Sequence, residues 1–485
     1  MLSACGSADN SPTQEARVIR MGLATMPSNL DPRFATDASS ERINLLLYDQ
    51  LVAIDQSALP EPALASWQQL SLQHYRFSLA ENLPRFTDGR ELTVDDVLAT
   101  YSFVLDEKNL SPLRQPIEHI SALNKISARE FDVLLSHVDP LLPARMTLSI
   151  LPADLMANNH DFNRQPVGSG KFEFVERDSD QRIGLIRRDD KQHFEFIRVK
   201  EPVTRVLKLM RGEIDLLQND IPPELSGYLQ KSADIKCISE AGSNFSYIGF
   251  NMSDPLTGDP RIRKAIAMAI DRQAIIQYVF HGAARTAETI LPPGHWAGHK
   301  QLPVLDYNPG KARELLGAAG FNEHRPLVIT YKTSSDPFRI KLATIIQAQL
   351  AKVGINVKIM SYDWGTFFGD IKKGNFQMYS LTWVGVKTPD IYQRVFHSSS
   401  LPPAGANRGR YESPVADQLL DKIAAGQTLN QRADLYYKLQ ALLHDELVYI
   451  PLWYEHQQAF MKNDIVGYQL QADGNYSALN NVRRQ

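Results

Sequence analysis

The chain has 485 residues and a formal net charge of −3, and 22% of its residues are charged. A single hydrophobic core rarely extends beyond roughly 250–300 residues, so this length predicts more than one core. The charge balance offers no basic field for nucleic acid, and no apolar run approaches the ~20 residues that cross a bilayer. The two cysteines, Cys5 and Cys237, are too few for a disulfide framework and lack the spacing of a zinc site.

Residues 1–16 combine a short motif with a polar stretch. The tetrapeptide from Leu2 to Cys5 is similar to the bacterial lipobox, in which a signal peptide is cut just before a cysteine that carries diacylglycerol. The alternative is a chance match. We expect lipidation at Cys5, which makes residues 1–16 a lipobox remnant and flexible tether.

Strands and helices alternate along the first half of the chain. Apolar and polar residues alternate over residues 17–23 and 75–79, which is typical of strands. Thr93 stands where the N-cap of a helix belongs, because its hydroxyl can accept a free N–H of the first turn. Gly212 follows another predicted helix and precedes a strand that includes Leu216.

The segment from Gly168 to Lys171 looks like the end of a phosphate-binding loop. Such a loop requires a glycine five residues before its Gly-Lys pair and a serine or threonine after the lysine. Gln165 and Phe172 occupy these two places. The sequence therefore does not predict nucleotide binding.

The most informative stretch is residues 247–282. An apolar run from Tyr247 to Phe250 predicts a strand, and the following Pro/Gly-containing segment predicts a turn. Asp259 then stands at an N-cap with Pro260 at the first helical position, and Asp271 is expected to cap a second helix that ends at Gly282. In the first helix the apolar face holds Ile262, Ala265, Ile266 and Ala269, and the cations Arg261, Arg263 and Lys264 are expected to face elsewhere.

A strand, a helix and a strand follow at residues 327–332, 339–350 and 354–357, joined by short loops. This order indicates α/β lobes.

The same segments resemble the family 5 extracellular solute-binding proteins of ABC importers, the family of oligopeptide- and dipeptide-binding proteins. In that family an apolar strand with Phe-Asn leads through a proline turn to an acid, Arg-x-Arg-x-Ala-Ile and Ala-Ile-Asp-Arg, and residues 250–272 match each part. Matching blocks continue in order from about Arg17 to the C-terminus, at residues 29–32, 41–55, 61–67, 86–97, 166–172, 208–216, 307–316 and 354–357.

The resemblance implies an α/β fold with two lobes of the periplasmic-binding-protein type and a ligand cleft between them. Lobe I would comprise residues 17–40, 165–250 and 456–485, an inserted subdomain residues 41–164, and lobe II residues 251–455. Residues 247–251 would form a hinge crossing, and the loop at residues 29–32 would lie near the pocket. Closure of the lobes would bury the ligand, where polar groups act in a low dielectric.

The main candidate for the pocket is residues 377–392. Alternation over Tyr379, Leu381 and Trp383 predicts a strand that runs into a turn at Gly385. Peptide-binding members of the family are similar here but carry an aspartate three residues after the tryptophan, which holds the peptide's ammonium group. Val386 occupies that position in this chain, and the nearby Asp390 matches a later acid of the family pattern.

Two interpretations of the ligand remain open. Either a peptide amine is held elsewhere, for example by Asp390 after a loop shift, or the ligand is not recognised through an ammonium group. Lys387 with Asn407 and Arg408 would favour an anionic or carbonyl-rich solute, unless they form a solvated loop. Trp383 is expected to contact the ligand, with core packing as the alternative. Asn244, Phe245 and Tyr247 form a second candidate wall, and a core role for Phe245 is equally compatible with the sequence.

Neither an enzyme nor a metal site is predicted. The chain lacks Gly-x-Ser-x-Gly, His-Glu-x-x-His and a Cys-His pattern of useful spacing, and His295 and His299 lie in a Gly/Pro-rich loop. We expect a monomeric periplasmic or cell-surface lipoprotein that needs no cofactor and delivers a solute, expected to be a di- or oligopeptide, to an ABC permease. The alternatives are a metal complex, glycan or anionic solute, a hydrolytic enzyme, or a sensor lipoprotein.

Overall fold

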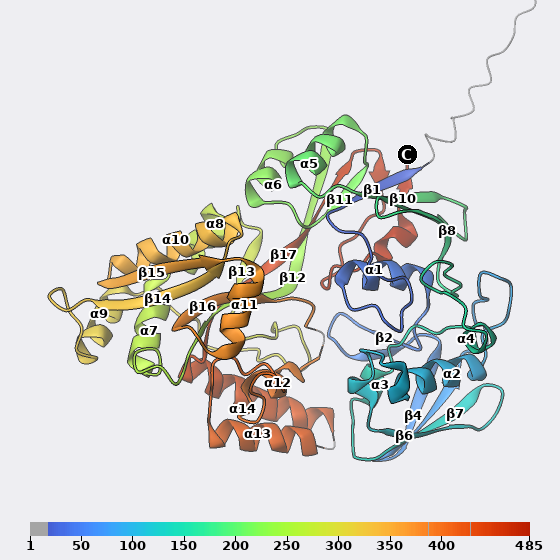
Figure 1. The fold of residues 1–485 in the computed structure, drawn as a ribbon, viewed down its shortest axis with the longest axis horizontal. Helices are drawn as coiled ribbons and strands as arrows, with labels where there is room; N and C mark the ends of the chain where they lie inside the picture. Colours follow the sequence, from blue (N-terminus) through green and yellow to red (C-terminus); the bar gives the residue numbers. More distant parts are fainter. Residues whose placement is uncertain (1–17, 387, 427) are drawn as a thin grey trace, which may run out of the picture.

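The computed structural model describes residues 18–386, 388–426 and 428–485. Its central element is an eleven-stranded sheet that continues through two lobes (Figure 1). The strand order is β15-β14-β16-β12-β17-β11-β1-β10-β9-β8, and β13 pairs with β17. No helix in the described ranges is long and apolar enough to cross a membrane.

Two long strands join the lobes. β12 (Ile235–Phe250) and β17 (Tyr449–Lys462) are antiparallel, and both pass between the halves of the molecule (Figure 1). Their register breaks in the middle, where residues 241–243 lie opposite His456 alone. A bulge of this kind interrupts the ladder and bends the strand locally. The bulge therefore marks the hinge between the lobes.

The first lobe packs around a core that gathers residues from both ends of the chain, among them Ile19, Phe196, Met461 and Leu479. A smaller cluster lies under its two surface helices, with Leu209 and Leu229 at its centre. The elements are β1 (Ile19–Leu23), α1 (Ala38–Leu47), β8 (Phe172–Asp178), β9 (Arg182–Arg187), β10 (His193–Arg198), α5 (Pro202–Arg211), β11 (Leu216–Gln218), α6 (Pro223–Leu229), β18 (Ile465–Val466) and β19 (Arg483–Arg484).

An inserted subdomain lies beside the first lobe, at the lower right of Figure 1, with its own four-stranded antiparallel sheet in the order β4-β5-β7-β6. Its separate core includes Phe77, Tyr101 and Phe131. The elements are β2 (Val52–Ile54), β3 (Pro60–Pro62), β4 (Ala65–Ser71), β5 (His74–Leu79), α2 (Val94–Leu105), β6 (Ile120–Lys125), β7 (Glu130–Leu135), α3 (Leu142–Arg145) and α4 (Ala153–Ala157).

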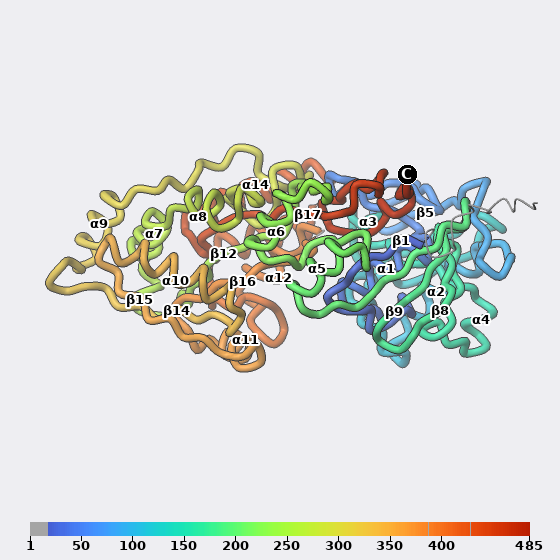
Figure 2. Tube along the Cα trace, turned by 90° about the horizontal axis from the view of Figure 1, so that it is seen from above, coloured from blue at the N-terminus to red at the C-terminus, as the bar shows by residue number. Residues whose placement is uncertain are grey.

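The second lobe fills the left half of Figures 1 and 2 and packs its two clusters on opposite faces of the same strands, since Ile248 belongs to one cluster and Tyr247 to the other. The elements are α7 (Pro260–Ala269), α8 (Arg272–Tyr278), β13 (Ala284–Thr286), α9 (Pro309–Ala318), β14 (Leu327–Ser334), α10 (Pro337–Ala351), β15 (Ile355–Tyr362), α11 (Trp364–Lys373), β16 (Met378–Trp383), α12 (Ile391–Phe396), α13 (Pro414–Ala425) and α14 (Leu429–Glu446).

Two segments pack into a different unit from the one that the expected lobe and subdomain boundaries gave them. Residues 244–250 of β12 pair with β16, and Ile248 and Phe250 lie in a second-lobe core, although the expected boundary followed residue 250. Helix α1, expected in the subdomain from residue 41 onward, contributes Ile43 and Leu46 to the first-lobe core instead. The sequence predicts where a strand or helix begins and ends more easily than it predicts which hydrophobic core that element joins.

The stretch at residues 247–282 forms the predicted strand, turn and two helices. Asp259 accepts the N–H of Arg261, and Asp271 accepts the N–H of Ala274, which confirms both caps. The second helix ends at Tyr278, before Gly282, which has a φ of 80°.

Arg263 departs from the expected pattern, because it is 4% exposed. Its guanidinium donates to the carbonyl oxygens of Thr257, Gly258, Glu446 and Leu447, so it ties α7 to the end of α14. A buried guanidinium is tolerated when its N–H groups are satisfied in this way.

Gly242 is expected to be required at the hinge. A Cβ atom at this position would lie 2.3 Å from the Glu455 carbonyl oxygen, closer than any normal contact. We expect Gly242→Val to lower the free energy of unfolding by about 2 kcal/mol in urea denaturation, because the two strands must separate to admit the side chain. The control is Ala241→Val at the exposed neighbouring position, and an equal loss in both variants would contradict the close-approach argument.

Candidate ligand-binding site

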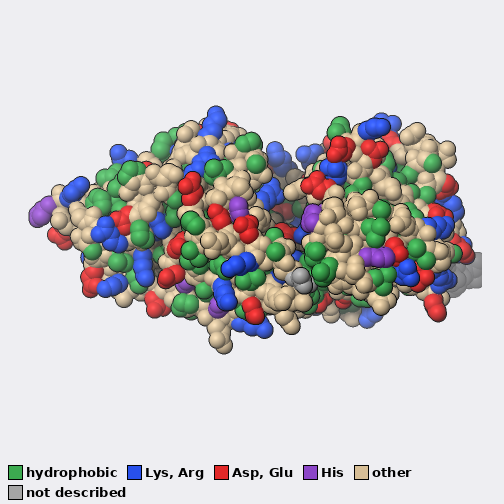
Figure 3. Space-filling view, turned by 90° about the horizontal axis from the view of Figure 1, so that it is seen from below, with side chains coloured by type: hydrophobic (Ala, Val, Ile, Leu, Met, Phe, Trp, Pro, Cys, Tyr) green, Lys and Arg blue, Asp and Glu red, His purple; other side chains and the backbone are tan. Residues whose placement is uncertain are grey.

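The strand register places the carboxyl ends of both lobes' parallel strands at the hinge. In the first lobe β1 and β11 run parallel, and Gln218 at the end of β11 pairs with Ala459 beside the hinge. In the second lobe β14, β15 and β16 run parallel, and Trp383 at the end of β16 pairs with Phe245 on the other side of the hinge. Ligands of open α/β sheets bind outside the carboxyl ends of the strands. These two edges face each other across the hinge, and Figure 3 shows the surface hollowed between the two halves.

An aromatic ladder with one cation forms the second-lobe wall. Trp383 stacks on Tyr247 at an interplanar angle of 11°, with ring centroids 6.4 Å apart. On Trp383 lies Arg408, whose Cζ is 4.6 Å from the Trp383 ring and 5.0 Å from the Phe368 ring. The Phe368 ring is in turn stacked on Trp364, which is 58% exposed. The ladder therefore runs from the core of the second lobe to its surface.

Burial opposes the charge of Arg408, but the hydroxyl oxygens of Tyr247, Tyr449 and Tyr379 support it. These oxygens outweigh the effect of burial, so the pKa of Arg408 lies above its ordinary value. The side chain is therefore a permanent cation.

The predicted site residues separate into buried and accessible groups. Phe245 and Tyr247 are 1% and 0% exposed in the core, which favours the packing role that the sequence left open for Phe245. Asn407 is 1% exposed, and its side-chain amide bonds to backbone groups of His397 and Tyr411. Trp383, Val386 and Arg408 are partly exposed, Asn244 is half-buried beside the hinge, and Gly385 is exposed. Lys387 lies outside the described residues.

Asp390 does not stand free for a ligand amine. Its carboxylate lies 2.7 Å from Nη1 of Arg145, a residue of the inserted subdomain, and 3.8 Å from Nη2 of Arg432 on α14. Arg145 also bonds Asp139 of the subdomain through its Nε at 2.7 Å. These four residues form an ion-pair cluster that joins the inserted subdomain to the second lobe.

The cluster is largely removed from water, since Asp139 and Arg432 are 6% and 4% exposed. Burial by itself would raise the pKa of Asp139, but bonds from His119 and Arg145 outweigh it and hold that pKa well below its usual range. Burial likewise opposes the charge of Arg145, and Asp390 and Asp139 overcome that effect and raise its pKa. Asp139 and Arg145 therefore remain charged at neutral pH.

The first-lobe edge was not singled out from the sequence. The loop after β1 and the residues after β11 line a small hollow with α1, through Thr25, Arg42, Asn219, Asp220 and Tyr476. Asn219 and Asp220 have φ values of 56° and 53°, and Asn219 bonds Gln457 and Gln458 beside the hinge. Asparagine and aspartate tolerate this left-handed backbone better than other residues do. An Asn-Asp pair directly after a short strand was the signal that could have identified this edge.

Three polar side chains at the hinge, those of Glu455, Ser246 and Thr382, bond one another. The Glu455 carboxylate accepts a hydrogen bond from Ser246 at 3.0 Å and lies 3.6 Å from Arg339. The Ser246 hydroxyl also bonds that of Thr382 at 2.7 Å. Glu455 is therefore held by the second lobe.

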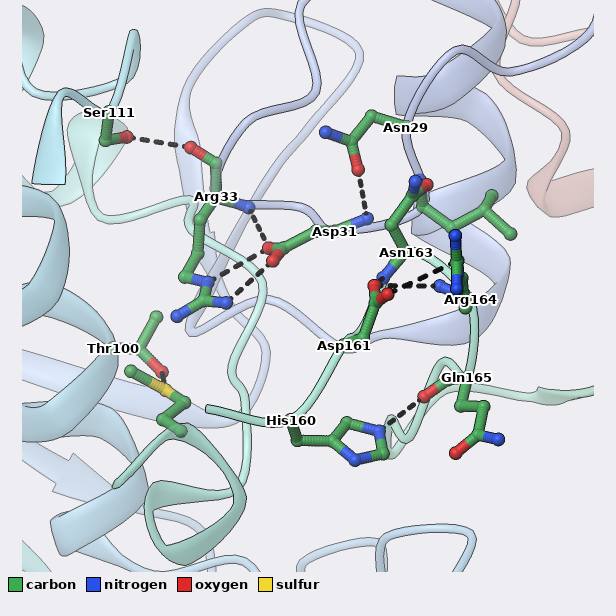
Figure 4. A network of polar contacts seen from close by, with 12 residues as sticks. Asn29, Asp31, Arg33, Thr100, Ser111, His160, Asp161, Asn163, Arg164 and Gln165 are labelled. Carbon is green, nitrogen blue, oxygen red and sulfur yellow. Dashed lines mark hydrogen bonds and ion pairs between the residues drawn. The ribbon is translucent and has the colours of Figure 1, made fainter. Parts of the chain in front are cut away.

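The loop at residues 29–32 is built around a buried ion pair (Figure 4). The Asp31 carboxylate receives two bonds from the Arg33 guanidinium, at 3.0 and 2.7 Å, and both residues are less than one-tenth exposed. Arg33 also lies over the Phe103 ring at 4.0 Å, and its carbonyl accepts the Ser111 hydroxyl. This geometry assigns the pair a role in joining the first lobe to the subdomain.

The segment from Gly168 to Lys171 also joins these two units. A Cβ atom at Gly170 would lie 2.4 Å from the Leu46 carbonyl oxygen, so the glycine permits packing against the end of α1. The segment borders an open cavity of about 720 Å³ lined also by Arg85, Arg188 and Asp49, away from the hinge.

Within the described ranges, no group of three or more histidine, cysteine or acidic side chains could hold a metal ion. His295 and His299 instead accept backbone N–H groups of Ala297 and Gln301 within their own loop.

Two α/β lobes joined by a strand hinge, with both carboxyl edges facing the hinge, define a binding protein of the periplasmic type. Residues 59–401 match the model of the bacterial extracellular solute-binding proteins, family 5 (middle region). The chain belongs to this family, which consists of solute-binding proteins.

Known relatives agree in length and fold. A probable ABC transporter periplasmic-binding protein, SapA of Escherichia coli, is 28% identical over 89% of this chain and 85% of its own. The oligopeptide-binding protein AppA of Bacillus subtilis is 26% identical over 96% of this chain and 93% of its own. The periplasmic binding protein DppA of Helicobacter pylori, solved with the peptide STSA, is 26% identical with a TM-score of 0.75, covering 97% of this chain and 99% of its own.

Asp139 is expected to stabilise the folded protein through the ion-pair cluster over a defined pH range. Removing one partner of a buried ion pair costs about 3 kcal/mol or more, so Asp139→Asn should lower the free energy of unfolding by roughly that amount at pH 7. Because the folded-state pKa is depressed, the contribution is fully present above the unfolded-state value of about 3.9 and declines as the pH falls below it.

Urea denaturation of both proteins between pH 8 and pH 3 measures this difference. The difference between the two free energies of unfolding should stay constant down to about pH 5 and become smaller below pH 4. The exposed Asp189, 3.6 Å from Lys171, provides the control Asp189→Asn, for which we expect a change within about 0.5 kcal/mol. A difference that grows toward low pH would contradict the assignment.

Proposed function

We propose that this chain is an extracytoplasmic receptor that captures a di- or oligopeptide between its lobes and delivers it to an ABC permease. The single observation that carries the proposal is the opposed pair of carboxyl edges at the hinge, with an aromatic wall on the second lobe. Membership of a solute-binding family and relatives named for oligopeptide or peptide ligands support it.

Capture works through closure in this proposal. The cluster of Arg145, Asp139, Asp390 and Arg432 bridges the subdomain and the second lobe, and the side chains of Glu224 on α6 and Lys341 on α10 pair directly between the lobes. Such contacts favour a closed form that a permease can distinguish from an open one. In this proposal the bound solute is released chemically unchanged.

Native mass spectrometry of the protein purified from cells tests this function. We expect a ladder of co-purified peptide masses, recovered unmodified after denaturation. Trp383→Ala should reduce the bound fraction by roughly 10–100-fold, because it removes an aromatic contact from the wall. The control Tyr278→Ala removes a 77% exposed tyrosine of α8 and should leave the ladder intact. A single non-peptide mass, or altered peptides, would contradict the proposal.

We further propose that Cys5 carries the lipid anchor and that the protein acts as a monomer at the membrane surface. Cys5 lies outside the described residues, so the proposal rests on the lipobox resemblance. In cells fed a clickable fatty acid, the precursor should be labelled and Cys5→Ser should not. The matched control Cys237→Ser should be labelled like the parent, since Cys237 is a free, half-buried thiol of β12. Normal labelling of Cys5→Ser would remove the anchor.

A further inference from the structure

Among the described residues, the carboxylates at the second-lobe edge already have partners. Asp390 is held by Arg145 and Arg432, Glu455 by Ser246 and Arg339, and Asp370 by Lys332. Asp336 and Asp363 cap α10 and α11. The acidic side chains of this edge are therefore already engaged.

Arg408 lies at the same edge and has no carboxylate partner there in the described part of the chain. Among the residues that the structure describes, no carboxylate forms an ion pair with Arg408, and the printed bond from its guanidinium goes to the Tyr247 hydroxyl at 3.4 Å. Its other N–H groups are not among the buried polar atoms without a partner, so they reach the surface. The rings of Trp383 and Phe368 fix the plane of the guanidinium. A guanidinium held in this way is prepared for two parallel bonds to a carboxylate.

The neighbouring groups strengthen the preference for an anion. Trp383 Nε1, beside Arg408, is a buried donor without an acceptor. Val384, Gly385 and Val386 follow Trp383, so these three positions of the turn after β16 offer no carboxylate to a ligand amine. This corner is rich in donors and poor in acceptors.

Resting on the function proposed above, we propose that Arg408 determines specificity by binding a carboxylate of the peptide ligand, and that a free amine is not needed at the Trp383–Val386 turn. The ligand class is peptides with a free carboxylate, including those whose amino end is blocked. The aromatic rings order the guanidinium, and the ligand supplies the missing negative charge.

The experiment uses a tetrapeptide library made in four forms: free, N-acetylated, C-amidated, and blocked at both ends. Retention of each form by the immobilised full chain is quantified by mass spectrometry. We expect acetylation to change retention less than 2-fold and amidation to weaken it at least 10-fold. In Arg408→Gln the penalty for amidation should disappear, with free and amidated forms bound equally weakly.

Two further variants separate charge from folding. Arg408→Lys keeps the charge but loses the planar fork, so its amidation penalty should be intermediate. The control Arg410→Gln removes a nearby cation whose guanidinium bonds the Lys372 carbonyl oxygen, and it should retain the full penalty. Melting temperatures and retention of the doubly blocked form verify that each variant is folded.

The outcomes distinguish the two proposals. If acetylation rather than amidation costs affinity, or if the amidation penalty persists in Arg408→Gln, the role of Arg408 is wrong while peptide capture stands. If no form of the library is retained, peptide capture itself is wrong.

Discussion

The antiparallel pairing of β12 with β17 is the contact on which both lobes depend. Each strand contributes one half to the first lobe and one half to the second, so the two lobes share a ladder and do not merely touch. The bulge at residues 241–243 interrupts that ladder between the lobes, and a second register shift lies between Ser246 and Tyr247. Because the strands stay paired on both sides of the bulge, we expect the lobes to move about it as rigid bodies.

This arrangement also explains why the cleft faces the hinge. β11 and β16 both end beside the bulge, one on each side, since both pair with the shared strands. Their following residues, Asn219 and Val384, therefore emerge toward the same space. Val384 is 61% exposed.

Local features of the fold could be predicted from the sequence, but the site only in part. The caps at Asp259 and Asp271 depend on neighbours three residues away or fewer, so they were predicted correctly. The burial of Arg263 depends on carbonyl groups of α14, which the helical pattern of α7 does not contain. The sequence identified Trp383, Val386 and Arg408 as candidates, but not Phe368, because only the folded chain stacks it against Arg408.

Asp390 illustrates the same limit. Its position in the family pattern left an amine-binding role open, whereas its partner Arg145 belongs to the inserted subdomain. A charge pair between two units cannot be read from either segment alone. The predicted boundaries differ from the packing for the same reason, since β12 and α1 pack where their long-range contacts place them.

Residues 479–484 return to the first lobe, and this has a consequence for how the core of that lobe forms. Val482 and Leu479 fill the first-lobe core, and Arg484 lies 2.8 Å from Asp215 at the foot of β11. The core of the first lobe is therefore complete only when residues 479–482 have joined residues from the first part of the chain. The subdomain core, by contrast, lies within residues 51–150 and can form as soon as that segment has emerged. The subdomain core thus comes from one continuous segment, whereas the first-lobe core joins segments that lie far apart in the sequence.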